Sequence, residues 1–254
     1  MLPYVAEEVK EDICRIIARL DRRLNDVDIQ KIIDNVWSLH AMGLANVGTG
    51  FLISNGYVIT AYHVVKNAGR IDCQIPSGNE IHLDLFRYSE PYDIALLKPE
   101  ITWSRGVNIS RRVPTPTKGE LVFTYGYPLG YRGPEPILSV GFLSGVCEEG
   151  SVKKLVANIA FNVGNSGGPL FNLRGQLLGI VRAKYYVALD PMLRNILREG
   201  LSRIVFRVQY TERVQYPVTL GDVIERLIKW VADNVQVNIG EAVSVKHLIE
   251  LLSE

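Results

Sequence analysis

The sequence predicts an all-β core with helices at both ends of the chain. From Val36 onward, short apolar runs alternate with Gly, Asn and Pro, a pattern typical of strands separated by turns. Roughly a dozen such runs at this spacing predict an antiparallel barrel or sandwich. Apolar residues at three- and four-residue steps predict helices before and after this core.

Turn and linker signals organise the predicted strands. Ser54-Asn55-Gly56 lies between two apolar runs, and asparagine and glycine tolerate the positive φ of hairpin turns. Arg174-Gly175 repeats this pattern more weakly. The stretch 111–118, R-R-V-P-T-P-T-K, reads as a linker and divides the strands into two similar halves.

The N-terminal segment, residues 1–34, is predicted to be helical. Apolar residues from Val5 to Leu24 recur at helical spacing with charges between them, and a shorter helix is expected from about Asp26 to Asp34. The segment either packs over the core or forms an interface for a homo-oligomer. Binding to a membrane surface fits less well, because the polar face mixes charges of both signs.

Composition excludes several classes of protein. The chain has 254 residues, of which 47% are hydrophobic and 22% charged, and its net charge of +1 predicts no bulk attraction to nucleic acid. No apolar run is long enough to span a membrane. The start lacks a signal-peptide pattern, and three widely spaced cysteines indicate neither a disulfide framework nor a zinc site. We therefore expect a cytoplasmic location.

Residues 161–170, F-N-V-G-N-S-G-G-P-L, carry the main chemical signal. Glycine weakens strands and proline interrupts them, so the run is either a sharp surface turn or a place where the backbone must approach a reacting group. In the second case Ser166 is a nucleophile, and the N–H groups of Gly164 and Ser166 converge on one point. The run also fits the nucleophile elbow of α/β-hydrolases, but the stretch after Pro169 reads as a hairpin rather than a helix.

A serine nucleophile needs a histidine base and a carboxylate that orients it. His63 lies where an apolar strand ends, in G-Y-V-I-T-A-Y-H-V-V. Asp93 enters the apolar strand P-Y-D-I-A-L-L-K, and burial of a carboxylate is costly unless it is paired. The alternative is a turn acid that caps the loop after Pro91.

The order His63, Asp93, Ser166 resembles that of the chymotrypsin-like serine peptidases. T-A-Y-H-V-V, Y-D-I-A-L-L and G-N-S-G-G-P-L occur in this order, over about residues 36–183. The glycine-rich entry strand, the G-x-P-x-G segment at 126–130 and the asparagine before the serine are similar to the HtrA/Deg branch. The resemblance implies two six-stranded antiparallel β-barrels with helical additions at both ends.

By this resemblance the chain is a serine endopeptidase that acts on polypeptides. His63 is then the general base, Asp93 its orienting acid, and Ser166 the nucleophile that forms an acyl-enzyme. The N–H groups of Gly164 and Ser166 form the oxyanion hole. No metal or organic cofactor is implied.

The resemblance also divides the chain and locates a pocket. The expected parts are a helical segment 1–34, a peptidase domain 35–234 with barrels at about 35–110 and 118–210 and a closing helix at about 220–234, and a helical tail 235–254. The pocket would contain Ala160, Arg182, Ala183 and Lys184. Ala160 offers no charge for a basic side chain, so cleavage after small or medium apolar residues is expected. An acidic preference is the alternative, because Arg182 and Lys184 lie two apart on one strand.

Two departures from the family bear on function. The family usually has a small hydroxyl residue where Arg182 falls, beside the catalytic aspartate, and an arginine there either quenches Asp93 or points into the cleft. The alternative function is therefore a catalytically silent binding or regulatory module with a protease fold. The chain after the last barrel strand is also too short for the PDZ domain of HtrA proteins.

Overall fold

The computed structural model describes residues 2–20, 44–103, 105–110, 112–184, 192, 195, 199–201, 203–211, 214–234 and 238–253. The chain forms two compact units. The first comprises Met1–Lys184 with Asn238–Glu254, and the second comprises Tyr185–Val237.

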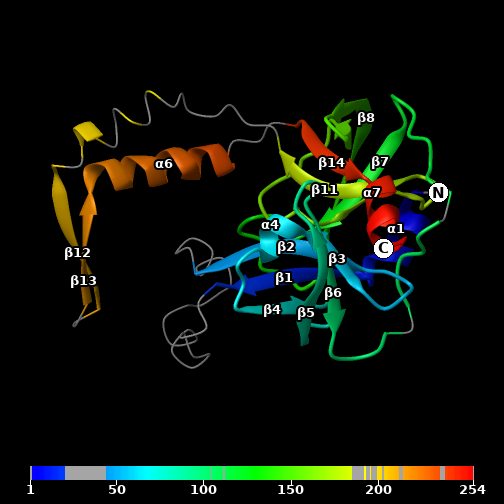
Figure 1. Cartoon of the computed structure of the whole chain (residues 1–254), viewed down its shortest axis with the longest axis horizontal. Coiled ribbons are helices and arrows are strands. Elements are labelled where there is room, and N and C mark those ends of the chain that lie inside the picture. The colour runs from blue at the N-terminus through cyan, green and yellow to red at the C-terminus, as the bar shows by residue number, and fades with distance from the viewer. Residues whose placement is uncertain are drawn as a thin grey trace. The chain divides into compact units, whose positions relative to one another are not determined.

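The first unit contains two closed six-stranded antiparallel barrels, as the resemblance implied (Figure 1). Barrel one has the strand order β1-β2-β3-β6-β5-β4: β1 (Ile13–Arg19), β2 (Ala45–Leu52), β3 (Val58–Ala61), β4 (Arg70–Gln74), β5 (Glu80–Ser89) and β6 (Ile94–Pro99). Barrel two has the order β10-β11-β14-β9-β8-β7: β7 (Leu121–Gly126), β8 (Ile137–Glu149), β9 (Val152–Ala157), β10 (Pro169–Asn172), β11 (Leu177–Lys184) and β14 (Gly240–Ser244). The predicted fold class is confirmed.

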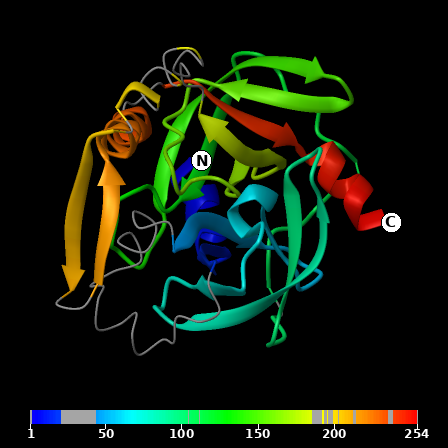
Figure 2. The same ribbon diagram turned by 60° about the vertical axis from the view of Figure 1, so that its left-hand side comes forward.

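One apolar cluster joins the two barrels. Phe51 of barrel one belongs to it together with Phe123 and Phe171 of barrel two, whose ring centroids are 5.3 Å apart. Helices α1 (Leu2–Lys10) and α7 (Val245–Ser253) pack on the same cluster. From the end of barrel two, α7 reaches β5 of barrel one (Figure 2). There Arg87 donates a hydrogen bond of 2.8 Å to the Leu251 carbonyl. The barrels are therefore held together by side chains from both ends of the chain.

The predicted N-terminal helix is wrong beyond Lys10. Ile13–Arg19 is strand β1, which pairs with β2 and β4 and is buried along almost its whole length. Its isoleucines fit a helical period as well as a strand, and β-branched residues favour strands when both faces are covered. The remainder of the predicted helical segment, residues 21–34, lies outside the described part of the chain.

The sixth strand of barrel two differs from the expected one. It is β14, which pairs with β9 and β11, rather than a strand from the stretch before residue 210. In the second unit, β12 (Val205–Thr211) pairs with β13 (Val214–Thr219), and helix α6 (Leu220–Asn234) follows. The helix directly after the last barrel strand is therefore α7. The sequence did not reveal β14 because only five residues of strand separate two helical patterns.

Among the helices in the described part of the chain, none has the length and apolar character of a membrane span.

Candidate active site

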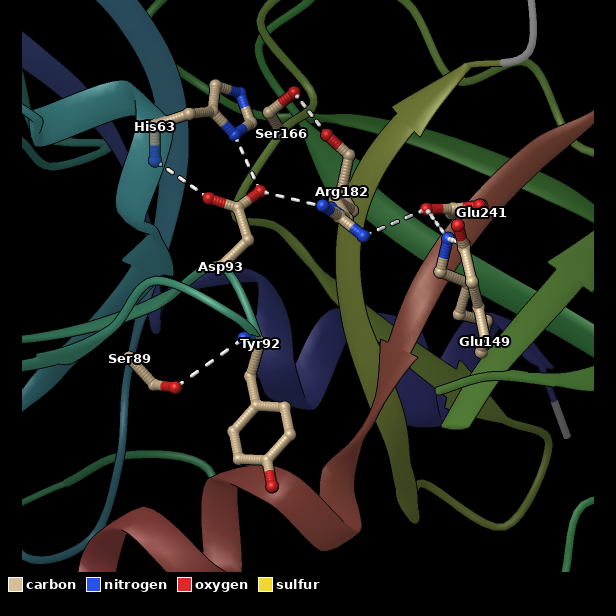
Figure 3. Close-up of polar contacts among 9 residues, drawn as sticks. His63, Ser89, Tyr92, Asp93, Glu149, Ser166, Arg182 and Glu241 are labelled. Carbon is tan, nitrogen blue, oxygen red and sulfur yellow. Dashed lines mark hydrogen bonds and ion pairs between the residues drawn. The ribbon is translucent and has the colours of Figure 1, made fainter. Parts of the chain in front are cut away.

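His63 is held by Asp93 at both its backbone and its ring. β3 ends at Ala61, and the short helix α4 (Tyr62–Val65) carries His63 away from the barrel. The His63 N–H donates to Asp93 Oδ1 at 2.8 Å, and Nδ1 lies 2.7 Å from Oδ2 (Figure 3). An ionised carboxylate only accepts hydrogen bonds, so Nδ1 carries the ring proton and Nε2 is left as a base.

Asp93 occupies a strained position between β5 and β6. Its φ of 54° lies in the left-handed region, which is uncommon for residues other than glycine, although aspartate tolerates it better than most. Its side chain is 9% exposed, whereas that of His63 is 50% exposed. The Asp93 carboxylate therefore contacts both the backbone and the ring of an accessible histidine, an arrangement compatible with the predicted orienting role.

Ser166 lies in the loop between β9 and β10, and its glycines allow that loop to press against barrel one. Gly164 and Gly167 have φ values of 96° and 90°. A Cβ atom at Gly167 would lie 2.2 Å from both the Thr49 carbonyl oxygen and Thr60 Oγ1. The glycine cluster is thus required by close backbone approach, which excludes an unconstrained surface turn.

Thr49 of β2 anchors this loop, a role that sequence analysis missed. Its N–H donates to the Ser166 carbonyl at 2.9 Å. Its buried hydroxyl donates to the Gly164 carbonyl at 2.7 Å and accepts from the Tyr127 N–H at 3.0 Å. The sequence feature that could have indicated this role is G-T-G at residues 48–50, within an apolar strand. Gly48 leaves room for the Ser166 carbonyl.

The carbonyls next to Ser166 are fixed by other parts of the chain. The Val163 carbonyl accepts from the Leu129 N–H at 2.7 Å, and the Gly164 carbonyl accepts from Thr49. Within the described residues, the N–H groups of Gly164 and Ser166 donate to no protein acceptor. This arrangement is compatible with the predicted oxyanion hole, which stays a prediction.

The Ser166 hydroxyl donates to the Arg182 carbonyl at 3.0 Å, beside the His63 ring in Figure 3. Catalytic hydrogen bonds are often not formed until substrate is bound. The Arg182 side chain points away from this hydroxyl. Its Nε lies 3.5 Å from Asp93 Oδ2, and its Nη1 lies 3.3 Å from Glu241 Oε1.

The other predicted pocket residues are placed only in part. The Ala160 carbonyl accepts from Asn165 Nδ2 at 3.2 Å, so Ala160 lies beneath the serine loop. Ala183 and Lys184 continue β11, paired with Glu241 and Gly240, and their side chains fall outside the described part of the structure. Their role in specificity stays a prediction. The described residues include no group of three or more His, Cys, Asp or Glu that could hold a metal ion.

Comparison with known proteins matches residues 48–180 to the trypsin-like peptidase domain. The sequence is 34% identical over 140 residues to a probable periplasmic serine endoprotease, DegP-like, of Hahella chejuensis, covering 53% of this chain and 29% of that protein. It is 27% identical over 183 residues to the serine protease HTRA1A of Danio rerio, covering 66% and 37%. The chain therefore matches only about a third of the length of these relatives.

A solved structure has the same fold. The HtrA-type protease AlgW, determined with a decapeptide, superimposes with a TM-score of 0.62 at 16% identity over 100% of this chain and 66% of that one. The expected cytoplasmic location is contradicted, because similar proteins from Hahella chejuensis and Ectopseudomonas mendocina are described as periplasmic. Net charge and cysteine count do not distinguish these compartments for a chain with few cysteines.

Proposed function

Because this chain belongs to the trypsin-like peptidase family, we propose that it is a serine endopeptidase of the HtrA/DegP type. The observation that carries the proposal is the position of the hydrogen-bonded His63–Asp93 pair beside Ser166. Ser166 stands on a glycine-rich loop where, within the described residues, the N–H groups of Gly164 and Ser166 donate to no protein acceptor. The residues come from both barrels, so the reaction would take place where the barrels meet.

The proposed mechanism assigns one step to each group. Ser166 Oγ attacks the carbonyl carbon of a peptide while His63 Nε2 takes the hydroxyl proton. The N–H groups of Gly164 and Ser166 stabilise the oxyanion. His63 then protonates the leaving amine, and water activated by the same imidazole releases the acyl group from Ser166. Asp93 stays ionised and stabilises the imidazolium.

The proposed substrates are polypeptides cleaved after small or medium apolar residues. Ala160 supplies no carboxylate that would select lysine or arginine. An acidic preference has less support, since the Arg182 guanidinium already lies between the carboxylates of Asp93 and Glu241. Digestion of a peptide library tests this, and cleavage mainly after lysine or arginine would contradict the pocket assignment.

The proposed location is periplasmic, in line with the described location of the bacterial relatives. Assembly through the N-terminal segment has less support than packing. The apolar side chains of α1 (Leu2, Val5, Ala6 and Val9) pack on the cluster between the barrels. Light scattering of the whole chain measures its assembly state directly.

Labelling by a fluorophosphonate probe tests the proposed activity, because such a probe reports an activated serine without needing the natural substrate. We expect Ser166 to be labelled and Ser166→Ala to abolish the label while the fold is retained. Ser144→Ala, at an exposed serine of β8, is the matched control and should label normally. Persistent labelling of Ser166→Ala would refute the assignment.

A catalytically silent binding module is the second candidate, and the contact between Arg182 and Asp93 is the observation that favours it. A cation beside Asp93 opposes the imidazolium that catalysis requires. Wild-type protein that is folded but neither labels nor cleaves casein would establish this candidate and exclude the peptidase.

A further inference from the structure

Arg182 is the extra residue of an irregularity in β11. Val181 pairs with Ala242 and Ala183 pairs with Glu241, so Arg182 has no partner of its own in the β14 ladder. Such bulges redirect a side chain and are common next to active sites. Here the bulge turns the guanidinium toward the turn that carries Asp93 (Figure 3).

A row of alternating charges runs from this guanidinium into barrel two. Arg182 lies between Asp93 and Glu241, at 3.5 Å and 3.3 Å. Glu241 Oε1 also lies 3.2 Å from Lys154 Nζ, and Lys154 forms a further ion pair with Glu149. The order is negative, positive, negative, positive, negative from Asp93 outward. Figure 3 shows Glu241 on the side of Arg182 away from Asp93.

Three members of this row are shielded from water: the exposed fractions of the side chains are 9% for Asp93, 11% for Glu241 and 10% for Lys154. The Arg182 side chain is 31% exposed. Burial lowers the pKa of Lys154, but its hydrogen bonds with Glu149 and Glu241 outweigh that effect and raise the pKa, so Lys154 is charged. Interactions between such buried charges are weakened little by salt.

The position of Arg182 gives it two opposing effects on the triad. Its Nε lies near the same oxygen of Asp93 that binds His63 Nδ1, so it helps to hold that carboxylate. Its positive charge also disfavours a second positive charge on His63, which must form in the transition state. The Glu241 carboxylate, on the far side of the guanidinium, offsets the repulsion between Arg182 and a positively charged His63. It leaves the contact between Arg182 and Asp93 in place.

We propose that Arg182 and Glu241 are positioning residues for the triad: Arg182 holds Asp93, and Glu241 balances the charge of Arg182 so that His63 can still accept a proton. This inference rests on the proposed peptidase function. In this arrangement the pair of Arg182 and Glu241 in barrel two positions the Asp93 carboxylate that holds His63 in barrel one.

A double-mutant cycle tests the balance. Glu241→Gln removes the charged carboxylate on the side of Arg182 away from Asp93, and we expect kcat to fall about tenfold with little change in KM. In an Arg182→Met background the same change should lower kcat less than about twofold, because no cation remains to balance. Glu80→Gln is the matched control, since Glu80 also pairs with an arginine but lies at the opposite end of β5 from Asp93. It should leave kcat unchanged.

The low-field NMR resonance of the proton between His63 Nδ1 and Asp93 Oδ2 gives a readout without turnover. Glu241→Gln should move this resonance upfield, and adding Arg182→Met should reverse the shift. If wild-type protein neither labels nor cleaves, the peptidase function fails, while the resonance still tests the charge balance. Should Glu241→Gln not fold, Lys154→Met is measured instead. This change removes the cation of Lys154 from Glu241 and leaves the contact between Glu241 and Arg182, so it should not lower kcat.

Three results would overturn the proposal. The first is an equal loss of kcat from Glu241→Gln with and without Arg182. The second is an unchanged resonance in Glu241→Gln. The third is a loss of kcat in Lys154→Met as large as that expected for Glu241→Gln.

Discussion

Thr49→Val removes one hydroxyl group and leaves the shape of the side chain nearly unchanged. That hydroxyl donates to the Gly164 carbonyl at 2.7 Å and accepts from the Tyr127 N–H at 3.0 Å. Thr49 is fully buried, so water cannot replace either bond. Because Gly164 supplies one of the two proposed oxyanion donors, the substitution should affect both stability and catalysis.

The size of the effect follows from the two groups left without a partner. An unsatisfied buried donor or acceptor costs about 1–3 kcal/mol, so two cost about 2–6 kcal/mol. The added methyl group returns about 0.8 kcal/mol through burial. We therefore expect the free energy of unfolding to fall by about 1–5 kcal/mol. The rate of fluorophosphonate labelling should fall about tenfold or more, since loss of a positioned oxyanion donor has effects of this order or larger.

Two other buried threonines provide a graded control for this prediction. The Thr60 hydroxyl makes one hydrogen bond of 2.8 Å, to the Thr49 carbonyl, and the Thr124 hydroxyl makes only a contact of 3.4 Å. Urea unfolding should rank the losses as Thr49→Val, then Thr60→Val, then Thr124→Val. If Thr49→Val resembled Thr124→Val in both stability and labelling rate, the hydroxyl would not anchor the serine loop.

Three further changes test other parts of the structure. Asp93→Asn should lower kcat about 10³–10⁴-fold, because the amide selects the wrong imidazole tautomer; peptide hydrolysis measures this, and a nearly unchanged rate would assign the orienting role to another acid. Gly167→Ala should lower the melting temperature and the labelling rate, because the new Cβ would lie 2.2 Å from two oxygen atoms of barrel one. Gly78→Ala is the control: its φ is similar, 87°, but no atom lies within 4 Å of the new Cβ, so it should show only the backbone strain. Burial raises the pKa of Asp12 while Arg105 counteracts this, so ionisation of Asp12 costs stability as pH rises. Arg105→Met should therefore reduce the free energy of unfolding more at about pH 7 than at about pH 4, and an equal loss at both would contradict the argument.

The members of the proposed triad could be named from sequence because each lies in a short local pattern. Ser166 stands among glycines, and His63 and Asp93 each stand at one end of an apolar strand. Strand β1 was not predictable, since the spacing of its isoleucines fits a helix as well as a strand. Its pairing with β2 and β4, which are distant in sequence, decides between the two. The same holds for β14, whose five residues gain their strand character from β9 and β11.

Sequence motifs leave out some residues of a functional site, and Thr49 and Glu241 are two examples. Glu241 lies outside the segments that carry the resemblance, and Thr49 lies in the glycine-rich entry strand, where the resemblance gave it no role. Thr49 reaches the serine loop from barrel one, and Glu241 reaches Arg182 from a strand close to the C-terminus. Both act on groups that a motif does identify, one by fixing the Gly164 carbonyl and the other by pairing with the cation beside Asp93. A search for the motifs around His63, Asp93 and Ser166 would therefore match a variant that lacks either residue, although the geometry and charge around the proposed triad would differ.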